Sequence, residues 1–206
     1  MVVRQTGWNK KKADLLIVIL IVLVFAGLFF WVWWGNTRSA GNQLPDVTMN
    51  TIQGQAYPLQ ETNGRVRLLE FIYTHCPDVC PVTTMKMVEL QEQLKKQGIF
   101  GNKVEFVTIT IDPENDTPEI LEEYARRLKM DQSGWTILRG TEGQTKEVTQ
   151  ALQFYSEKAD GGLISHSTIT YLVDENNNIR EKFGMGASLD TNEILSAIDK
   201  LVGKGS

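Results

Sequence analysis

Hydrophobic residues follow two different patterns along the chain. Residues 15–34 form a run of 20 residues without a charge or a proline. From residue 44 onward, short apolar runs alternate with amphipathic segments of helical period. The chain therefore divides into an apolar N-terminal helix and a later part that alternates strands and helices.

The run at 15–34 is long enough to cross a membrane. At 1.5 Å per residue, a helix of this length spans about 30 Å, the thickness of the hydrocarbon core of a bilayer. Trp31, Trp33 and Trp34 lie at its C-terminal end, where indole rings favour the membrane interface. The alternative is a cleaved signal peptide, but its apolar region would be shorter, and only a weak cleavage site follows. We therefore predict an uncleaved transmembrane anchor.

Charges are distributed unequally around this run. Three lysines at 10–12 precede it and only Arg38 follows closely, which predicts a cytoplasmic segment 1–14 and a globular part outside the cytoplasm. Four of the 21 basic residues and one of the 25 acidic residues lie in residues 1–34, so the remainder carries about −7. This acidic balance argues against nucleic-acid binding, which needs a basic face.

The segment 35–42 is small and polar, which predicts a linker before a globular domain at 43–206. Val148, Leu152 and Tyr155 would form the apolar face of one helix of that domain. Strands separated by helices favour a mixed sheet covered on both faces, an α/β fold. In order, the expected elements are strand 66–73, a helix from after Pro81 to Gly98, strand 104–111, a helix capped by Thr117 with Pro118 first, strand 135–138, helix 145–158, hairpin 167–174 and 178–183, and a helix from Asp190 with Glu193 completing a capping box.

The chain has two cysteines, Cys76 and Cys80, directly after strand 66–73. A structural disulfide between them would close a very short loop and add little stability, and a domain of this size does not need one. We expect Cys76 in a loop and Cys80 near the first turn of a helix, since Pro81 disfavours a regular helix through the whole motif. A helix N-terminus favours the thiolate, so the pair is predicted to be reactive or to bind a metal.

Two thiolates favour soft ions such as Cu(I), zinc or iron–sulfur clusters. A structural zinc site normally has four protein ligands, yet the chain offers only His75 and His166 besides the cysteines. Two sulfurs and one nitrogen suit three-coordinate Cu(I), and Cu(II) if a further ligand is supplied. From the residues alone, His166 is as consistent with a surface loop as with a ligand, and His75 is more typical of an incidental neighbour.

Several other side chains lie near this chemistry in the sequence. Asp112 and Asp116 follow strand 104–111, and Asp78 lies between the cysteines. These carboxylates would either support the metal ligands and receive a partner, or form turns and helix caps. Met85 and Met87 have the spacing of packing or surface positions rather than of thioether ligands.

Three segments together resemble the Sco/SenC family. They are YTHCPDVCP at 73–81, DPENDTP at 112–118 and HSTITYLVD at 166–174. Their order and separation also match that family, and the resemblance covers residues 43–203. It implies a thioredoxin-like fold, in keeping with the predicted order of strands and helices.

The resemblance also implies a function and a site. Cys76, Cys80 and His166 would bind copper as both Cu(I) and Cu(II). The protein would be a metallochaperone that helps to assemble the binuclear copper centre of cytochrome c oxidase, with the copper-bearing subunit as its partner. The oligomeric state stays open.

Two alternative functions share the fold. A thiol–disulfide oxidoreductase or redox sensor would use Cys76 and Cys80 as a redox disulfide. Ordinary thioredoxins, however, carry CxxC and a facing proline, whereas the spacing here is longer and the residues beside His166 are serines. A thiol peroxidase would need an arginine near its cysteine, but Arg65 and Arg67 lie too early in their strand.

Overall fold

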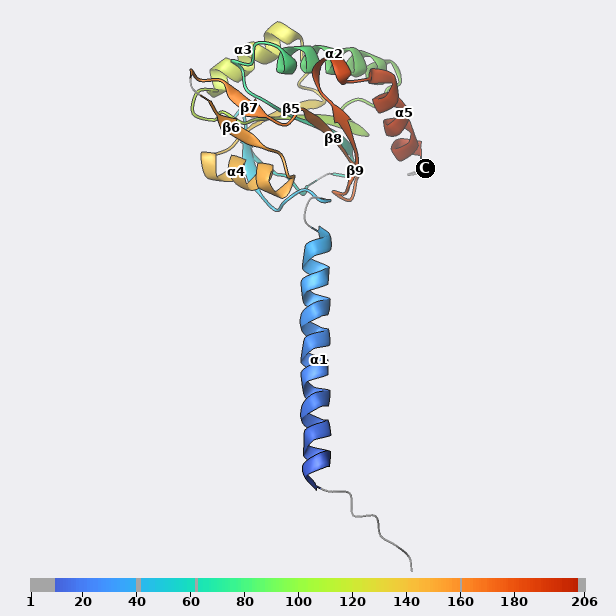
Figure 1. Cartoon of the computed structure of the whole chain (residues 1–206). Helices are drawn as coiled ribbons and strands as arrows, with labels where there is room; N and C mark the ends of the chain where they lie inside the picture. The colour runs from blue at the N-terminus through green and yellow to red at the C-terminus, as the bar shows by residue number, and fades with distance from the viewer. Residues whose placement is uncertain (1–9, 40–41, 62, 160, 204–206) are drawn as a thin grey trace, which may run out of the picture. The chain divides into compact units, whose positions relative to one another are not determined.

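A computed structural model of the chain describes residues 10–39, 42–61, 63–159 and 161–203 (Figure 1). Its contacts divide the chain into two compact units, Met1–Ala40 and Gly41–Ser206.

The first unit contains one helix, α1, Lys10–Ser39. Its segment Ala13–Trp31 has a mean hydropathy of 3.0 and no buried residue, so by length and composition it could cross a membrane. A signal sequence near the N-terminus would have the same properties. The helix extends beyond the predicted run 15–34 at both ends.

The second unit is built on a seven-stranded mixed sheet in the order β2-β1-β5-β4-β3-β8-β9. The central strands β3, β4 and β5 are parallel to one another, and the outer strands are antiparallel. Every residue of β3 and β4 is buried, as expected for strands covered on both faces. The strands are β1 Thr48–Thr51, β2 Ala56–Pro58, β3 Val66–Ile72, β4 Val104–Thr110, β5 Trp135–Arg139, β8 Ile169–Val173 and β9 Ile179–Gly184.

The described residues of this unit also form four helices and one short 3-10 turn. Figure 1 shows α2, α3 and α5 on one side of the sheet and α4 on the other, so the predicted covering of both faces is confirmed. The elements are α2 Val79–Lys96, α3 Pro118–Leu128, α4 Glu142–Ala151, η1 Gly186–Ser188 and α5 Thr191–Val202.

The predicted helix ends are confirmed in three places. Thr117 accepts a hydrogen bond from the amide of Ile120 at the start of α3. Asp190 caps α5 by accepting from the amides of Asn192 and Glu193, although the reciprocal bond from the Glu193 side chain that would complete the expected capping box is not among the contacts of the described residues. Gly98 follows α2 with a left-handed φ of 71°, a conformation that glycine adopts at little cost.

One predicted helix is wrong in its second half. The segment expected to be helical to residue 158 leaves the helix after Ala151, and Gln153 has a left-handed φ of 56°. Tyr155, predicted on the apolar face, is instead 54% exposed. Phe154 turns inward and packs on Phe71 of β3 with ring centroids 4.4 Å apart, so tertiary packing outweighs the helical period.

After this break the chain forms a two-stranded antiparallel hairpin that lies outside the main sheet. Its strands are β6, Ser156–Lys158, and β7, Ile164–His166. The strand expected from residue 167 therefore begins only at Ile169, and His166 belongs to the preceding strand.

The strands β1 and β2 were not predicted. They have four and three residues, too few for a recognisable period, and most of their positions are exposed or half-buried.

Candidate metal centre

Three side chains with metal-binding atoms meet at the C-terminal end of β3. The sulfurs of Cys76 and Cys80 and a ring nitrogen of His166 all lie within 4.8 Å of one another. The distance from Cys80 Sγ to His166 Nε2 is 3.9 Å, and both cysteines are free thiols. Within the described part of the chain, no other group of three or more His, Cys, Asp or Glu residues is arranged in this way.

The two cysteines are placed by the junction between β3 and α2. The chain leaves β3 through a turn in which the amide of Cys76 donates to the carbonyl of Tyr73 (3.1 Å). Helix α2 begins at Val79 and not after Pro81 as expected, so Cys80 lies in its first turn, fully buried, while Cys76 is half-buried outside it. Pro81 is tolerated because the amides of a first helical turn lack partners within the helix.

Hydrogen bonds give the two sulfurs different protonation states. The pKa of Cys76 is lowered to about 3, chiefly because the Cys80 thiol donates to its sulfur and further because His166 and backbone amides do so. The Cys80 amide lies 3.4 Å from that sulfur. Conversely, the Cys76 thiolate and burial raise the pKa of Cys80. The pair is therefore a half-exposed thiolate beside a buried thiol.

The imidazole of His166 is held in one orientation. Its Nδ1 lies 2.7 Å from the carbonyl oxygen of Ser167, and because a carbonyl can only accept, Nδ1 carries the hydrogen. Nε2, which lies 3.9 Å from Cys80 Sγ, donates to the Cys76 sulfur when the ring is protonated and carries a lone pair for a metal when the ring is neutral. Phe154 stacks against the ring at 5.9 Å, and Tyr73 meets it edge-on at 5.8 Å. The nearby Cys76 thiolate raises the pKa of the imidazole.

Asp116, one of the predicted supporting carboxylates, is fully buried next to the cysteine loop. Its two oxygens accept from the amide of Thr74, each at 3.2 Å, and also from the hydroxyls of Thr74 and Thr110. Burial raises the pKa of this carboxyl. Because Thr74 precedes Cys76 by two residues, Asp116 ties the cysteine loop to the end of β4.

The other two predicted carboxylates have different surroundings. Asp112 is buried and lies 3.2 Å from the ammonium of Lys158. Asp78 is exposed at the N-cap of α2 and makes no side-chain cap bond. None of the three carboxylates belongs to the cluster of two sulfurs and one nitrogen.

The remaining sequence candidates lie outside the cluster. His75 is exposed and lines a shallow hollow beside α3. Met87 is buried in the core and Met85 is 49% exposed, as expected for a packing and a surface position. At the N-terminal end of β3, Arg67 donates to the carbonyl of Leu59, and Arg65 pairs with Glu105.

Sequence reasoning missed a buried carboxyl beneath the cysteines. Glu70 of β3 is fully buried and accepts from the hydroxyls of Thr108 (2.9 Å) and Thr84 (3.3 Å), the latter one turn after Cys80. Burial raises the pKa of Glu70 to about 8. A charged residue inside the apolar run VRLLEFIY was the signal that could have found it.

Comparisons with known proteins identify similar sequences and similar folds. The sequence model described as SCO1/SenC matches residues 39–203. A SCO2-like protein of Rickettsia felis is 34% identical over 141 residues, which are 66% of this chain and 66% of that protein.

Solved structures share the fold. A SCO1/SenC family lipoprotein from Bacillus anthracis superposes with a TM-score of 0.72 at 25% identity, covering 78% of this chain and 95% of that one. Arabidopsis thaliana ScoI, solved with copper bound, gives a TM-score of 0.66 at 25% identity, covering 78% and 98%. The predicted thioredoxin-like α/β fold is therefore confirmed.

Proposed function

The chain belongs to the SCO1/SenC family, and from that membership we propose that it binds copper and takes part in the assembly of cytochrome c oxidase. The observation that supports the proposal most strongly is that the sulfurs of Cys76 and Cys80 and a ring nitrogen of His166 lie within 4.8 Å of one another. Copper is bound in the related A. thaliana structure, which supports the choice of ion.

The donor set suits copper on chemical grounds. Two cysteine sulfurs and an imidazole nitrogen are soft to borderline ligands, and three of them satisfy Cu(I). A structural zinc site would need a fourth protein ligand, and the described residues supply no further His, Cys, Asp or Glu to this group. In our proposal the same three residues hold Cu(I) and Cu(II), with the second state completed by a ligand from outside the cluster.

The unequal burial of the sulfurs suggests how copper is exchanged. Cys76 is half-exposed and already a thiolate, so a partner's cysteine or histidine can begin ligand exchange there. Cys80 is buried and would release its proton as it binds copper and be the last ligand to leave. The proposed recipient is the copper-bearing subunit of cytochrome c oxidase.

We assign α1 the role of membrane anchor, with residues 1–14 in the cytoplasm, the span at 15–34, a linker at 35–42 and the copper-binding domain at 43–206 outside. An anchor raises the effective concentration of the domain beside a membrane-bound oxidase. The protein should stay in membranes after alkaline carbonate extraction, and protease added to spheroplasts should digest the domain. Release of a shortened, soluble domain would contradict the anchor and favour a cleaved signal sequence.

Copper titration of the full-length protein in detergent, with its thiols reduced, tests the function. We expect one tightly bound copper per chain and sulfur-to-copper charge transfer in the Cu(II) form. Cys76→Ser and His166→Ala should weaken or alter this binding, whereas the matched control His75→Ala should not. If the protein binds no copper tightly, or if His166→Ala leaves copper binding unchanged, the proposed site is contradicted.

A second candidate function is favoured by the low pKa of Cys76 beside the Cys80 thiol. In thiol–disulfide exchange, the Cys76 thiolate would attack a partner's disulfide, and Cys80 would then resolve the mixed disulfide. The partner would gain two electrons and the Cys76–Cys80 disulfide would form. A reductase of this kind should keep its activity in His166→Ala, so loss of activity with both thiols intact would count against it.

A further inference from the structure

The histidine of the metal centre lies on a hairpin with little support of its own. β6 and β7 pair over three positions, Ser156 with His166, Glu157 with Ser165, and Lys158 with Ile164, and one backbone bond at each end, Ala159 to Leu163 and Ser167 to Tyr155, extends the pairing. An isolated two-stranded hairpin is marginally stable in water. Contacts outside the hairpin must therefore hold His166 close to the sulfurs.

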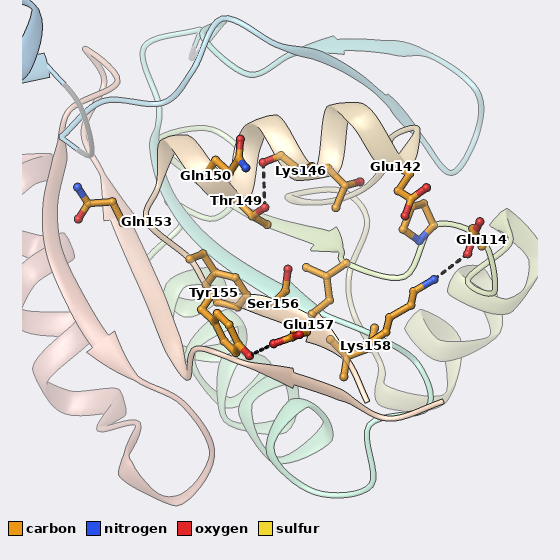
Figure 2. Close-up of a pocket in the computed structure, with 15 residues that line it drawn as sticks. Glu114, Glu142, Lys146, Thr149, Gln150, Gln153, Tyr155, Ser156, Glu157 and Lys158 are labelled. Carbon is orange, nitrogen blue, oxygen red and sulfur yellow. Dashed lines mark hydrogen bonds and ion pairs between the residues drawn. The ribbon is translucent and has the colours of Figure 1, made fainter. Parts of the chain in front are cut away.

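A cavity borders the hairpin on the side of α4. It has a volume of about 670 Å³ and is lined by α4, by the hairpin and by the loop after β4. Figure 2 shows Thr149 and Gln150 of α4 on one side of this cavity and Lys158 on the other. The hairpin is therefore bordered here by a hollow rather than by solid packing.

Lys158 spans from the hairpin to the loop after β4. Its ammonium lies 2.7 Å from a carboxylate oxygen of Glu114, the contact drawn in Figure 2, and 3.2 Å from Oδ1 of Asp112. Asp112 is 4% exposed at its side chain, and its other oxygen accepts from Asn115. Among the described residues Oδ1 has no hydrogen-bond partner, so Lys158 is its counter-charge.

The same loop also holds the cysteines. The amide of Asp116 donates to the carbonyl of Asp112 (2.9 Å), and the Asp116 side chain accepts from Thr74, two residues before Cys76. A continuous series of polar contacts thus runs from the cysteine loop, through residues 112–116, to the histidine hairpin.

We propose that Lys158 is a positioning residue for the metal centre. Its ion pair with Asp112, called the tie below, joins the hairpin that carries His166 to the loop at residues 112–116. Asp116 in turn joins this loop to the cysteine loop. The tie fixes how closely the imidazole approaches the two sulfurs. Its metal-related consequence rests on the proposed function, whereas the tie itself is a property of the fold.

The burial of Asp112 is what gives the tie its strength. The contact between Lys158 and Glu114 is exposed, and pairs of this kind contribute little. Removal of the ammonium from a buried carboxylate leaves an uncompensated charge, which is much more costly. The hairpin would then lose its hold on the loop.

Hydrogen exchange in the reduced, copper-free full-length protein tests the tie directly. In Lys158→Met the amides of residues 156–166 should exchange at least about tenfold faster, while those of 66–80 stay unchanged. Lys158→Arg should restore protection, and Lys146→Met, a lysine of α4 that lines the same cavity, should have no effect. Asp112→Asn should by itself increase exchange of the same segment, and in Lys158→Met it should restore part of the protection, because it removes the buried charge that has lost its partner.

Cu(II) spectra of the same variants test the consequence at the metal. Lys158→Met should shift the charge-transfer band towards that of His166→Ala, and Lys158→Arg should restore it. If Lys158 only stabilised the fold, Lys158→Met would lower the melting temperature without shifting the charge-transfer band. The proposal is overturned by unchanged exchange of 156–166, or by exchange that rises equally across the domain. If the wild type binds no copper, the proposed function fails while the exchange result still decides the tie.

Discussion

The cysteines of the candidate metal centre lie where the central strand β3 meets helix α2, whereas its histidine lies on a hairpin outside the main sheet. Strand β3 is buried along its whole length and bonded to strands on both sides. The hairpin pairs only with itself and borders a cavity. Strand β3, helix α2 and the buried Asp116 thus hold the sulfur half of the candidate centre, whereas a short hairpin and its side-chain contacts hold the nitrogen half.

This difference suggests a division of roles. A rigid pair of sulfurs sets the affinity for a soft ion, while a more weakly held imidazole can tune that affinity or yield first during transfer. Variants of the sulfur half should therefore have larger effects than variants of the nitrogen half.

The largest effect is expected for Cys80→Ser. Loss of the buried sulfur should weaken Cu(I) binding by more than about 100-fold, beyond the effect of residues that merely support ligands. Competition with a chromophoric Cu(I) chelator measures this change. Retention of wild-type affinity would show that Cys80 is not a ligand.

Asp116→Ala should release the cysteine loop. It leaves the Thr74 amide and the hydroxyls of Thr74 and Thr110 without their acceptor, so the free energy of unfolding should fall by about 2 kcal/mol. Urea denaturation of the reduced protein provides the measurement, with the exposed Asp78→Ala as control. Equal stabilities of the two variants would refute this role for Asp116.

Glu70→Gln should change how stability depends on pH. With a pKa of about 8 in the folded state against an ordinary 4.5, Glu70 is protonated in the folded protein over a range in which the unfolded chain has lost that proton. The contribution of Glu70 to the free energy of unfolding is therefore fully present below pH 4.5 and is lost as the pH rises towards about 8. Over this range the contribution of Glu70 to the free energy of unfolding falls by at most about 1.4 kcal/mol per pH unit.

Denaturation midpoints measured from pH 5 to pH 8 should thus fall less steeply for Glu70→Gln than for the wild type. Glu122→Gln, an exposed glutamate on α3, is the matched control. Parallel curves for wild type and Glu70→Gln would mean that Glu70 is ionised in the folded protein.

The smallest effect is expected for Phe154→Leu, which probes the nitrogen half. The substitution removes the ring stacked on His166 and the contact with Phe71, at a cost of about 1 kcal/mol. The Cu(II) spectrum should shift while Cu(I) affinity changes by less than about tenfold. A loss of Cu(I) affinity as large as that of Cys80→Ser would contradict the division between the halves.

The same contrast explains what the sequence could predict. The buried strand, CxxxC and Pro81 are local signals, and together they predicted the loop position of Cys76 and a position of Cys80 near the start of a helix, although that helix begins before Pro81 rather than after it. The caps at Thr117 and Asp190 were equally local. The turn-forming role of the segment 112–118 was recognised, but its side-chain contacts were not.

The position of His166 depends on tertiary contacts that no local sequence pattern predicts. The segment around Phe154 has a helical period, yet packing on β3 and pairing between β6 and β7 determine its conformation. Gly161 and Gly162, both with left-handed φ near the hairpin turn, were the local signal that was overlooked. The residues alone left His166 as consistent with a surface loop as with a ligand, and the family resemblance decided for the ligand.

X-ray absorption at the copper edge of the Cu(I)-loaded full-length protein tests the central claim most directly. The account predicts two sulfur ligands and one nitrogen ligand per copper in the wild type, and two sulfurs without that nitrogen in His166→Ala. A coordination sphere with fewer than two sulfurs, or one that His166→Ala leaves unchanged, would contradict the Cys76–Cys80–His166 site.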